Sequence, residues 1–499
     1  MSDWGGGYIT DVGYMPGWYR QQSPAMMTIA ALLGNVAAHF PGPDDAVSYL
    51  ELGCGQGYGA MLLAASNPGW TVTAIDFNPA HIAGAREWAA EAGLENIRFI
   101  EGDLSTLAED AASRDIPEAD FVSMHGVWSW APPAVQAGIV RLLKTKVRAG
   151  GLVHVSYNVL PGWGSAIGMQ RLLRESGRRL ASRSDRQVVQ ALKVAKDLLE
   201  AEAVQLKNSP LTRHLLELLD TMPVEYLAHE YMNASWSPCY HADVAAALAE
   251  AKLDFVASAE LTENFQQLML TPAQQEIMRR FDDPTMQELI KDICLERVLR
   301  HDVFVRGARR IAPAGRDGAL MNLPIVLTVP PDDLPLEADL PVGKAELRRE
   351  FYQPVAQALA KDARRVGDLL ALPDLVGRRD NPAELIGILV GLGFAEPVLR
   401  PGVEPGRQAM RFNAVAARRY AGTVGLHRPV GVASYRLGGG ATIAILDLMV
   451  ADRALAGETD IDALVAHINA PPDQIKRLKQ IIGQSVAERL PLLRAAGVL

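Results

Sequence analysis

The 499-residue sequence predicts an α/β protein built on a doubly wound, Rossmann-like parallel sheet. Strand-like and helix-like segments alternate between residues 46 and 158. The first strand-like run, AVSYLEL (46–52), is apolar enough for a strand that is buried on both faces. The loop GCGQGYG (53–59) then places glycines at alternate positions directly before a helix. Because ligands of such sheets bind at the carboxyl ends of the strands, we expect the functional site around this loop.

The other strands of the sheet follow in order along the chain. The sequence predicts them at WTVTAID (70–76), IRFIEGD (97–103), ADFVSMHGV (119–127) and LVHVSYN (152–158). Helical patterns separate them, and one helix is expected to begin with Asn78 as N-cap before Pro79.

The pattern changes after residue 158. Residues 165–235 read almost wholly as helix, and RQVVQALKVAKDLLEAEAVQL (186–206) is their clearest amphipathic stretch. Strand-like segments return at 252–260 and 301–307. We therefore expect a helical insertion in a sheet that these two strands complete.

The C-terminal part is expected to form modules of α+β type that carry no motif of their own. We expect them to act as a structural cap or an interaction platform rather than a second active site. The predicted units are a core (1–164), the helical insertion (165–235), the end of the sheet (236–312), a Pro/Gly-rich linker with one embedded strand (313–343), a winged-helix-like module (344–424) and an α/β module (425–499).

Composition excludes several classes of function. A net charge of −9 does not favour binding to nucleic acid or to an anionic membrane. No apolar run reaches the roughly 20 residues of a membrane span, and the first residues do not resemble a signal peptide. Cys54, Cys239 and Cys294 lie far apart, which predicts reduced thiols and no structural metal. We expect a cytoplasmic protein that does not insert into a membrane. The sequence is compatible with an oligomer.

Acidic residues at the strand ends indicate which ligand the glycine loop holds. Glu51 precedes the loop glycines Gly53, Gly55 and Gly57, and Asp76 and Asp103 end the second and third strands. Asp76 can accept hydrogen bonds from both ribose hydroxyls of either a dinucleotide or S-adenosylmethionine (SAM). Glu51 near a methionine moiety and Asp103 near an adenine amino group favour SAM. Taken singly, Asp103 could equally be a helix N-cap, and Asp76 a turn residue.

Aromatic residues are concentrated in three short segments where loops should face the cofactor. They are expected to wall an acceptor pocket for an amine, because aromatic faces attract cationic amines. The eight aromatics are Tyr8, Tyr14, Trp18, Tyr19, Trp128, Trp130, Tyr157 and Trp163. We expect Trp128 and Trp130 to wall the pocket, and Tyr157 and Asn158 to orient the acceptor. His125 could be a wall beside the cofactor, a general base or a structural residue.

Two segments resemble signature stretches of a bacterial class I methyltransferase family with a methyltransferase regulatory domain. They are MHGVWSWAPPAV (124–135) and VSYNVLPGW (155–163), and residues 225–261 are similar to the core of the regulatory domain. The resemblance is strong over residues 8–310 and weaker beyond. It implies cofactor contacts at Gly53, Gly55, Asp76, Phe77, Asp103, Leu104 and His125. Near the N-terminus the chain departs from the family pattern, with Gln22 and Ser23.

The family resemblance also suggests the reaction. Its members include rickettsial protein lysine methyltransferases that modify outer-membrane proteins, which implies SAM as cofactor and a protein lysine as acceptor. One alternative is an O- or N-methyltransferase acting on a saccharide or small metabolite. Another is a SAM-binding scaffold, which the intact glycine loop and Asp76 disfavour.

Overall fold

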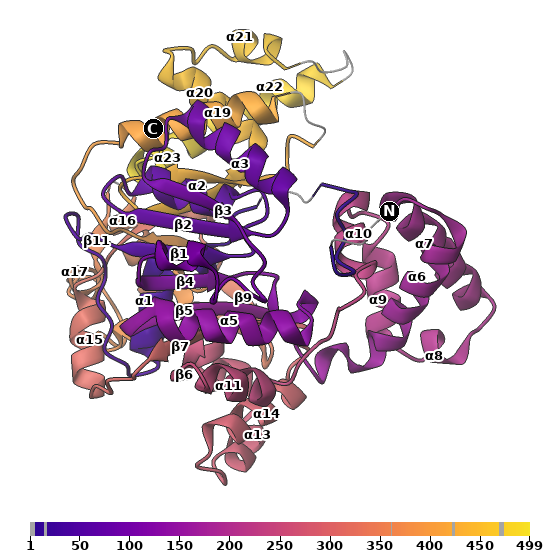
Figure 1. Cartoon of the computed structure of the whole chain (residues 1–499). Helices are drawn as coiled ribbons and strands as arrows, with labels where there is room; N and C mark the ends of the chain where they lie inside the picture. The colour runs from indigo at the N-terminus through magenta and orange to yellow at the C-terminus, as the bar shows by residue number, and fades with distance from the viewer. Residues whose placement is uncertain (1–4, 14–16, 361, 422–424, 469–473) are drawn as a thin grey trace.

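The structure is a computed structural model that describes residues 5–13, 17–360, 362–421, 425–468 and 474–499 (Figure 1). Its centre is a seven-stranded sheet of order β3-β2-β1-β4-β5-β7-β6. The strands are β1 (Ser48–Leu52), β2 (Thr71–Asp76), β3 (Ile97–Glu101), β4 (Ala119–Met124), β5 (Val147–Asn158), β6 (Leu253–Ser258) and β7 (Leu299–Arg306). The first five are parallel, and β7 runs antiparallel to both β5 and β6. The predicted fold class is confirmed, including the late return of the last two strands.

Side chains alternate along each strand, so each strand supplies apolar side chains to both faces of the sheet. Helices cover both of these faces. On β5, Leu152 belongs to the core under α1 (Pro24–Leu33), α2 (Tyr58–Ser66) and α3 (Pro79–Ala92). Val153 belongs to the opposite core, under α5 (Pro133–Lys146) and α11 (His241–Ala249). The parity of a residue in its strand therefore decides which layer it enters.

Between β5 and α11 the chain forms a lobe of helices that projects from the sheet (Figure 1). The lobe has its own apolar core, which Ile9 and Val12 of the N-terminal segment join. Its helices are α6 (Ile167–Leu180), α7 (Ser184–Glu200), α8 (Val204–Lys207), α9 (Pro210–Leu218) and α10 (Val224–Tyr231). After β6 the chain forms α12 (Gln266–Met269), α13 (Pro272–Met278) and α14 (Pro284–Cys294) before it enters β7.

Residues 313–343, expected as a linker with one embedded strand, contain more regular structure than that. They hold α15 (Pro313–Met321), β8 (Pro324–Leu327), β9 (Glu337–Leu340) and the start of β10 (Gly343–Glu346). Pro313 occupies the first turn of α15, where its missing N–H costs no hydrogen bond. Pro313 therefore marks the start of a helix.

The rest of the C-terminal part forms two further small sheets with helices. Strand β8 is central in the sheet β11-β8-β12, and α15, α17 and α18 pack together beside it. The winged-helix-like character expected for residues 344–424 remains a prediction. The other elements of this region are α16 (Arg349–Leu359), β11 (Arg364–Arg365), α17 (Val366–Leu370), α18 (Pro382–Leu389) and β12 (Ala395–Pro397). Then follow α19 (Arg407–Tyr420), the hairpin β13 (Pro429–Ser434) and β14 (Gly439–Ala444), α20 (Ile445–Leu455), α21 (Ile461–Ala466), α22 (Ile475–Gln484) and α23 (Leu490–Ala495).

The C-terminal hairpin packs directly on the helices of the central sheet. The Tyr58 hydroxyl donates to the Gly431 carbonyl (2.6 Å), and the Ser66 hydroxyl to the Gly439 carbonyl (2.6 Å). A Cβ atom on Gly440 would lie 2.8 Å from Leu62, so the backbone approaches α2 as closely as only glycine permits. One continuous apolar core therefore joins α1, α2 and α3 to the C-terminal helices.

No helix in the described ranges is long and apolar enough to cross a membrane.

Candidate active site

The loop between β1 and α2 turns through three glycines in the left-handed region. Their φ angles are 69° at Gly53, 53° at Gly55 and 70° at Gly57. A Cβ on Gly53 would lie 2.4 Å from Val127, and one on Gly57 would lie 2.4 Å from Phe99. The loop thus needs glycine for both conformation and space, and it leaves bare backbone facing the carboxyl ends of the strands.

Asp76 is fixed at the end of β2 beside this loop. Its carboxylate accepts hydrogen bonds from the backbone N–H groups of Gly55 (2.8 Å) and Asn78 (2.9 Å). His81 Nδ1 lies 3.5 Å away from the same carboxylate. Asp103, at the end of the β3 segment, accepts from Ser105 N–H (2.8 Å) and is exposed. Both aspartates therefore act locally as turn residues and still present carboxylate oxygen to the space between the strand ends.

Glu51 is the most unusual charged group at the site. Its side chain is buried, and one oxygen, Oε1, accepts from Gln22 Nε2 (3.2 Å). The other oxygen, Oε2, has no hydrogen-bond partner among the described residues. Burial raises the pKa of Glu51 to about 7, although the Gln22 hydrogen bond opposes this shift. A buried carboxylate oxygen without a partner fits a ligand that brings its own donor.

These groups surround a cavity of about 230 Å³ at the carboxyl ends of β1, β2 and β4. Most of the residues predicted from the sequence line it. They are Glu51, Gly53, Gly55, Asp76, Phe77, Asp103, Leu104, His125 and Trp130. Gly57 lies outside the lining and shapes the loop instead.

Tyr157, expected to orient the acceptor, does not line the cavity. Its place in β5 has the parity of Val153 and Val155, so its side chain enters the layer under α5 and α11. There its buried hydroxyl donates to Asp302 and contacts His241 Nδ1 at 3.2 Å. This geometry disagrees with an acceptor-orienting role and makes Tyr157 part of a buried ionic network.

Trp128 and Asn158 also lie outside the cavity lining. Trp128 is 2% exposed and packs in the same core as Tyr157. Asn158 ends β5 with its backbone N–H donating to Ser129 Oγ (2.8 Å) and its carbonyl accepting from Cys239 N–H (2.9 Å). Neither residue is therefore among those that line the cavity.

The N-terminal segment supplies aromatic residues that do line the cavity. Tyr8 packs edge-to-face on Phe77 with ring centres 5.6 Å apart, and Tyr19 stacks on His125 at 3.6 Å. Trp18 instead packs in the core against the C-terminal hairpin, and Trp163 packs on Trp236 in the lobe. Tyr14 lies outside the described residues.

Several cavity residues escaped the sequence reasoning. Gln22, His81 and Gln56 line the cavity, and Gln22 donates to Ser123 Oγ (3.0 Å) as well as to Glu51. The signal for Gln22 in the sequence was the departure from the family pattern at this position. The structure places its amide beside Glu51, at the entrance of the glycine loop.

Comparison with known proteins agrees with this geometry. Residues 43–217 match a family described as a methyltransferase domain, and residues 223–306 match one described as a predicted methyltransferase regulatory domain. The uncharacterized protein sll1526 of Synechocystis sp. is 34% identical over 406 residues, which cover 81% of this chain and 79% of that protein. The chain belongs to the SAM-dependent methyltransferases that carry a methyltransferase regulatory domain.

Other similar proteins extend the likeness along the whole methyltransferase. A Rickettsia prowazekii protein, RP028, is 28% identical over 215 residues, covering 42% of this chain and 80% of that protein. The solved structure of PKMT2 from Rickettsia typhi in complex with AdoHcy has a TM-score of 0.71 and 17% sequence identity. That match covers 97% of this chain and 99% of PKMT2, so the similarity of fold includes the C-terminal modules.

SAM is the cofactor of this methyltransferase, and the cavity has the features needed to hold it. The left-handed glycines leave room for close approach, Asp76 offers an acceptor for ribose hydroxyls, and Glu51 offers an unpaired oxygen for an amino group. Asp103 and Leu104 would contact the adenine. The individual contacts of these residues, and of Phe77 and His125, remain predictions.

Proposed function

We propose that this methyltransferase transfers methyl groups to lysine side chains of a protein. The observation that carries the proposal is the aromatic lining of the cavity by Tyr8, Tyr19 and Trp130, which come from separate segments. Aromatic faces attract an ammonium group and its methylated products. Exclusion of water from the bound amine opposes this attraction and lowers the pKa of the amine, which must be neutral to attack.

The remaining chemistry needs little from the chain beyond position and exclusion of water. When bound, SAM supplies an electrophilic methyl group on its sulfonium. Tyr19 and Tyr8 close the cavity over the strand ends through their contacts with His125 and Phe77. Holding the amine in line with the reacting methyl group is then the main contribution to rate.

The helical lobe would form part of the acceptor cleft. Tyr8 connects the two parts, because it packs on Phe77 at the cavity and lies 5.7 Å from the His229 ring of α10. The neighbouring Ile9 N–H donates to Asn233 Oδ1 (2.8 Å) just beyond α10. Exposed large apolar side chains also gather on the lobe, namely Ile167, Leu180, Val189, Leu198, Val204, Leu218 and Met222. Exposed apolar side chains on a lobe that the N-terminal segment connects to the cavity suit a polypeptide acceptor.

The architecture supports the same acceptor class. PKMT2 shares the fold over nearly its full length, and the sequence resembles rickettsial protein lysine methyltransferases. We place the enzyme in the cytoplasm, where Cys54, Cys239 and Cys294 would stay reduced as the free thiols observed.

The experiment follows the methyl label from SAM into a fractionated lysate of the source cell. We expect label in protein, and none in the same proteins after acetylation has blocked their lysines. Asp76→Ala should weaken SAM binding by about 1–3 kcal/mol and abolish labelling at low SAM. The matched control is Asp120→Ala, since Asp120 also accepts a backbone N–H, from Ser48 (2.8 Å), but at the other end of the strands. Label only in small molecules would favour the saccharide or metabolite alternative.

A further inference from the structure

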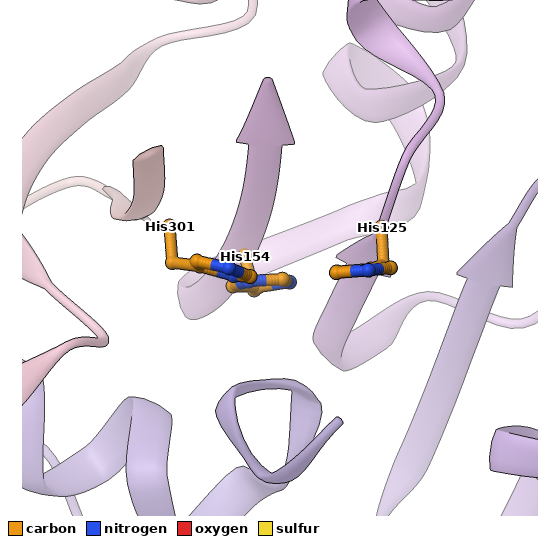
Figure 2. A group of neighbouring side chains, drawn as sticks. All are labelled: His125, His154 and His301. Atoms are coloured by element: carbon orange, nitrogen blue, oxygen red, sulfur yellow. The ribbon is translucent and has the colours of Figure 1, made fainter. Parts of the chain in front are cut away.

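Three histidines meet on one face of the central sheet. His125 directly follows β4, His154 lies in β5 and His301 lies in β7 (Figure 2). Ser123 pairs with His154 across β4 and β5, and Ser156 pairs with His301 across β5 and β7. Alternation then directs all three imidazoles into the layer beneath α1, where His154 is completely buried.

The imidazoles are arranged around a common point. The ring centres form a triangle with sides of 5.3, 5.4 and 6.3 Å, and the ring planes differ by 8° to 21°. A point equidistant from these centres therefore lies about 3.3 Å from each. A metal ion bonded to an imidazole nitrogen at about 2.0–2.1 Å lies at nearly this distance from the ring centre. One nitrogen from each ring lies within 4.8 Å of the other two, and His154 Nε2 is 3.1 Å from His301 Nδ1.

The second nitrogen of each ring has an oxygen neighbour. His154 Nδ1 lies 3.1 Å from Ser123 Oγ, and His125 Nδ1 lies 3.2 Å from Ser156 Oγ. His301 Nε2 lies 4.0 Å from a carboxylate oxygen of Glu260. Metal-bound histidines typically donate their outer N–H to an oxygen, which fixes the tautomer and aims the other nitrogen at the ion. The contacts of His154 and His125 have hydrogen-bond length, whereas the His301 contact is longer than a hydrogen bond.

The chemical state of the cluster also suits a cation. Each imidazole can offer the lone pair of one ring nitrogen as a ligand. An all-imidazole set favours zinc, iron, nickel or copper and disfavours magnesium and calcium, which prefer oxygen.

We infer that His125, His154 and His301 bind one divalent transition-metal ion in the wall of the cofactor cavity. His125 belongs to both the cluster and the cavity lining, and Tyr19 stacks on it. Three protein ligands leave at least one coordination position open. The sequence predicted no metal site, because the histidines come from three strands and His154 and His301 are 147 residues apart.

The test is metal titration of the full-length protein after dialysis against a chelator. We expect one Co²⁺ per chain with the visible absorption of a low-coordinate site, and displacement of Co²⁺ by Zn²⁺. His154→Gln and His301→Gln should weaken binding at least about 100-fold, and Ser156→Ala, which removes an outer partner, about 10- to 100-fold. His229→Gln is the matched control, because it removes an equally buried histidine outside the cluster and should bind Co²⁺ as the wild type does.

Circular dichroism would establish that each variant is folded. If both glutamine variants fail to fold, the affinity of Ser156→Ala decides. Absence of stoichiometric Co²⁺ and Zn²⁺ binding by the folded wild type, or unchanged affinity in Ser156→Ala or in folded cluster variants, would overturn the inference. The three histidines would then form only a hydrogen-bonded cluster.

Discussion

Glu51 shows how a single buried side chain couples the cavity to stability. Its ordinary pKa is 4.5, and burial raises it to about 7 in the folded chain. Between these pH values the folded protein retains a proton that the unfolded chain has lost. The free energy of unfolding must therefore fall as pH rises from about 4.5 to 7 and level off above.

Replacing Glu51 by glutamine should remove this pH dependence. We expect Glu51→Gln, without cofactor, to be up to about 3 kcal/mol more stable than the wild type at pH 8 and similar at pH 4.5. Urea unfolding at several pH values measures the difference, with the exposed Glu101→Gln as control. If the free energy of unfolding changed with pH in the same way for the wild type and Glu51→Gln, ionisation of Glu51 would cost the folded protein no stability.

Tyr157 provides the opposite case, a residue whose role is structural. Its hydroxyl donates to Asp302, whose pKa is lowered chiefly by the charge of Arg300 against the effect of burial. We expect Tyr157→Phe to reduce the free energy of unfolding by about 1.5–3 kcal/mol, because a buried carboxylate loses a hydrogen bond. SAM affinity and kcat should stay within about twofold of the wild type. A large loss of kcat with unchanged stability would restore the acceptor-orienting role; the exposed Tyr240→Phe serves as control.

Prediction of single residues from the sequence succeeded where the residue type and its place at the end of a strand both point to the same role. Gly53, Gly55 and Asp76 could be identified because the backbone needs glycine and the strand end needs an acceptor. Tyr157 could not, because only its parity within the strand decides the layer that its side chain enters. The histidine cluster depends on pairing between distant strands, which spacing in the sequence does not show.

At the scale of elements, the central strands could be predicted because their apolar runs are long and glycine-bounded. The helix α15 was missed because the proline at its first position suggested a linker, in which only one embedded strand was expected. The helical insertion could be predicted from its amphipathic periodicity, but its docking onto the N-terminal segment could not. That contact depends on Ile9, Val12 and Asn233, which have no periodic pattern.

The lobe should contribute to binding of a protein acceptor and not to the chemistry. Val204 at the start of α8 and Val376 in the C-terminal part are both 64% exposed. We expect Val204→Ser to raise KM for a protein acceptor about threefold to tenfold and to leave kcat unchanged, because apolar contact area is lost. Val376→Ser should change neither value. Equal effects of the two substitutions on KM would remove the lobe from the acceptor cleft.

At the scale of the whole molecule, the C-terminal modules are part of the core of the enzyme. The hairpin and α19 cover α2 and α3, and Arg400 Nη2 donates to Asn67 Oδ1 (2.9 Å) just after α2. Sequence alone suggested separable modules, because the contacts that join them to the sheet span more than 300 residues.

A chain that ends at residue 312 should therefore not remain natively folded. Loss of residues 313–499 would expose the apolar face of α2, including Leu62 and Met61, which are completely buried in the full chain. We expect aggregation or a non-cooperative thermal transition, and loss of measurable SAM binding by calorimetry. A soluble truncated chain with a cooperative transition and full SAM affinity would show that these modules serve only to recognise the protein acceptor.

The most direct test of the central claim is the chemical identity of the methylated residue. Protein labelled by the full-length enzyme with methyl-labelled SAM would be hydrolysed to amino acids and separated against methylated standards. The proposal predicts that the label elutes with mono-, di- or trimethyllysine and that Trp130→Ala reduces all of these products. Label that elutes with methylated arginine or histidine, or is released as methanol from a carboxyl ester, would contradict it.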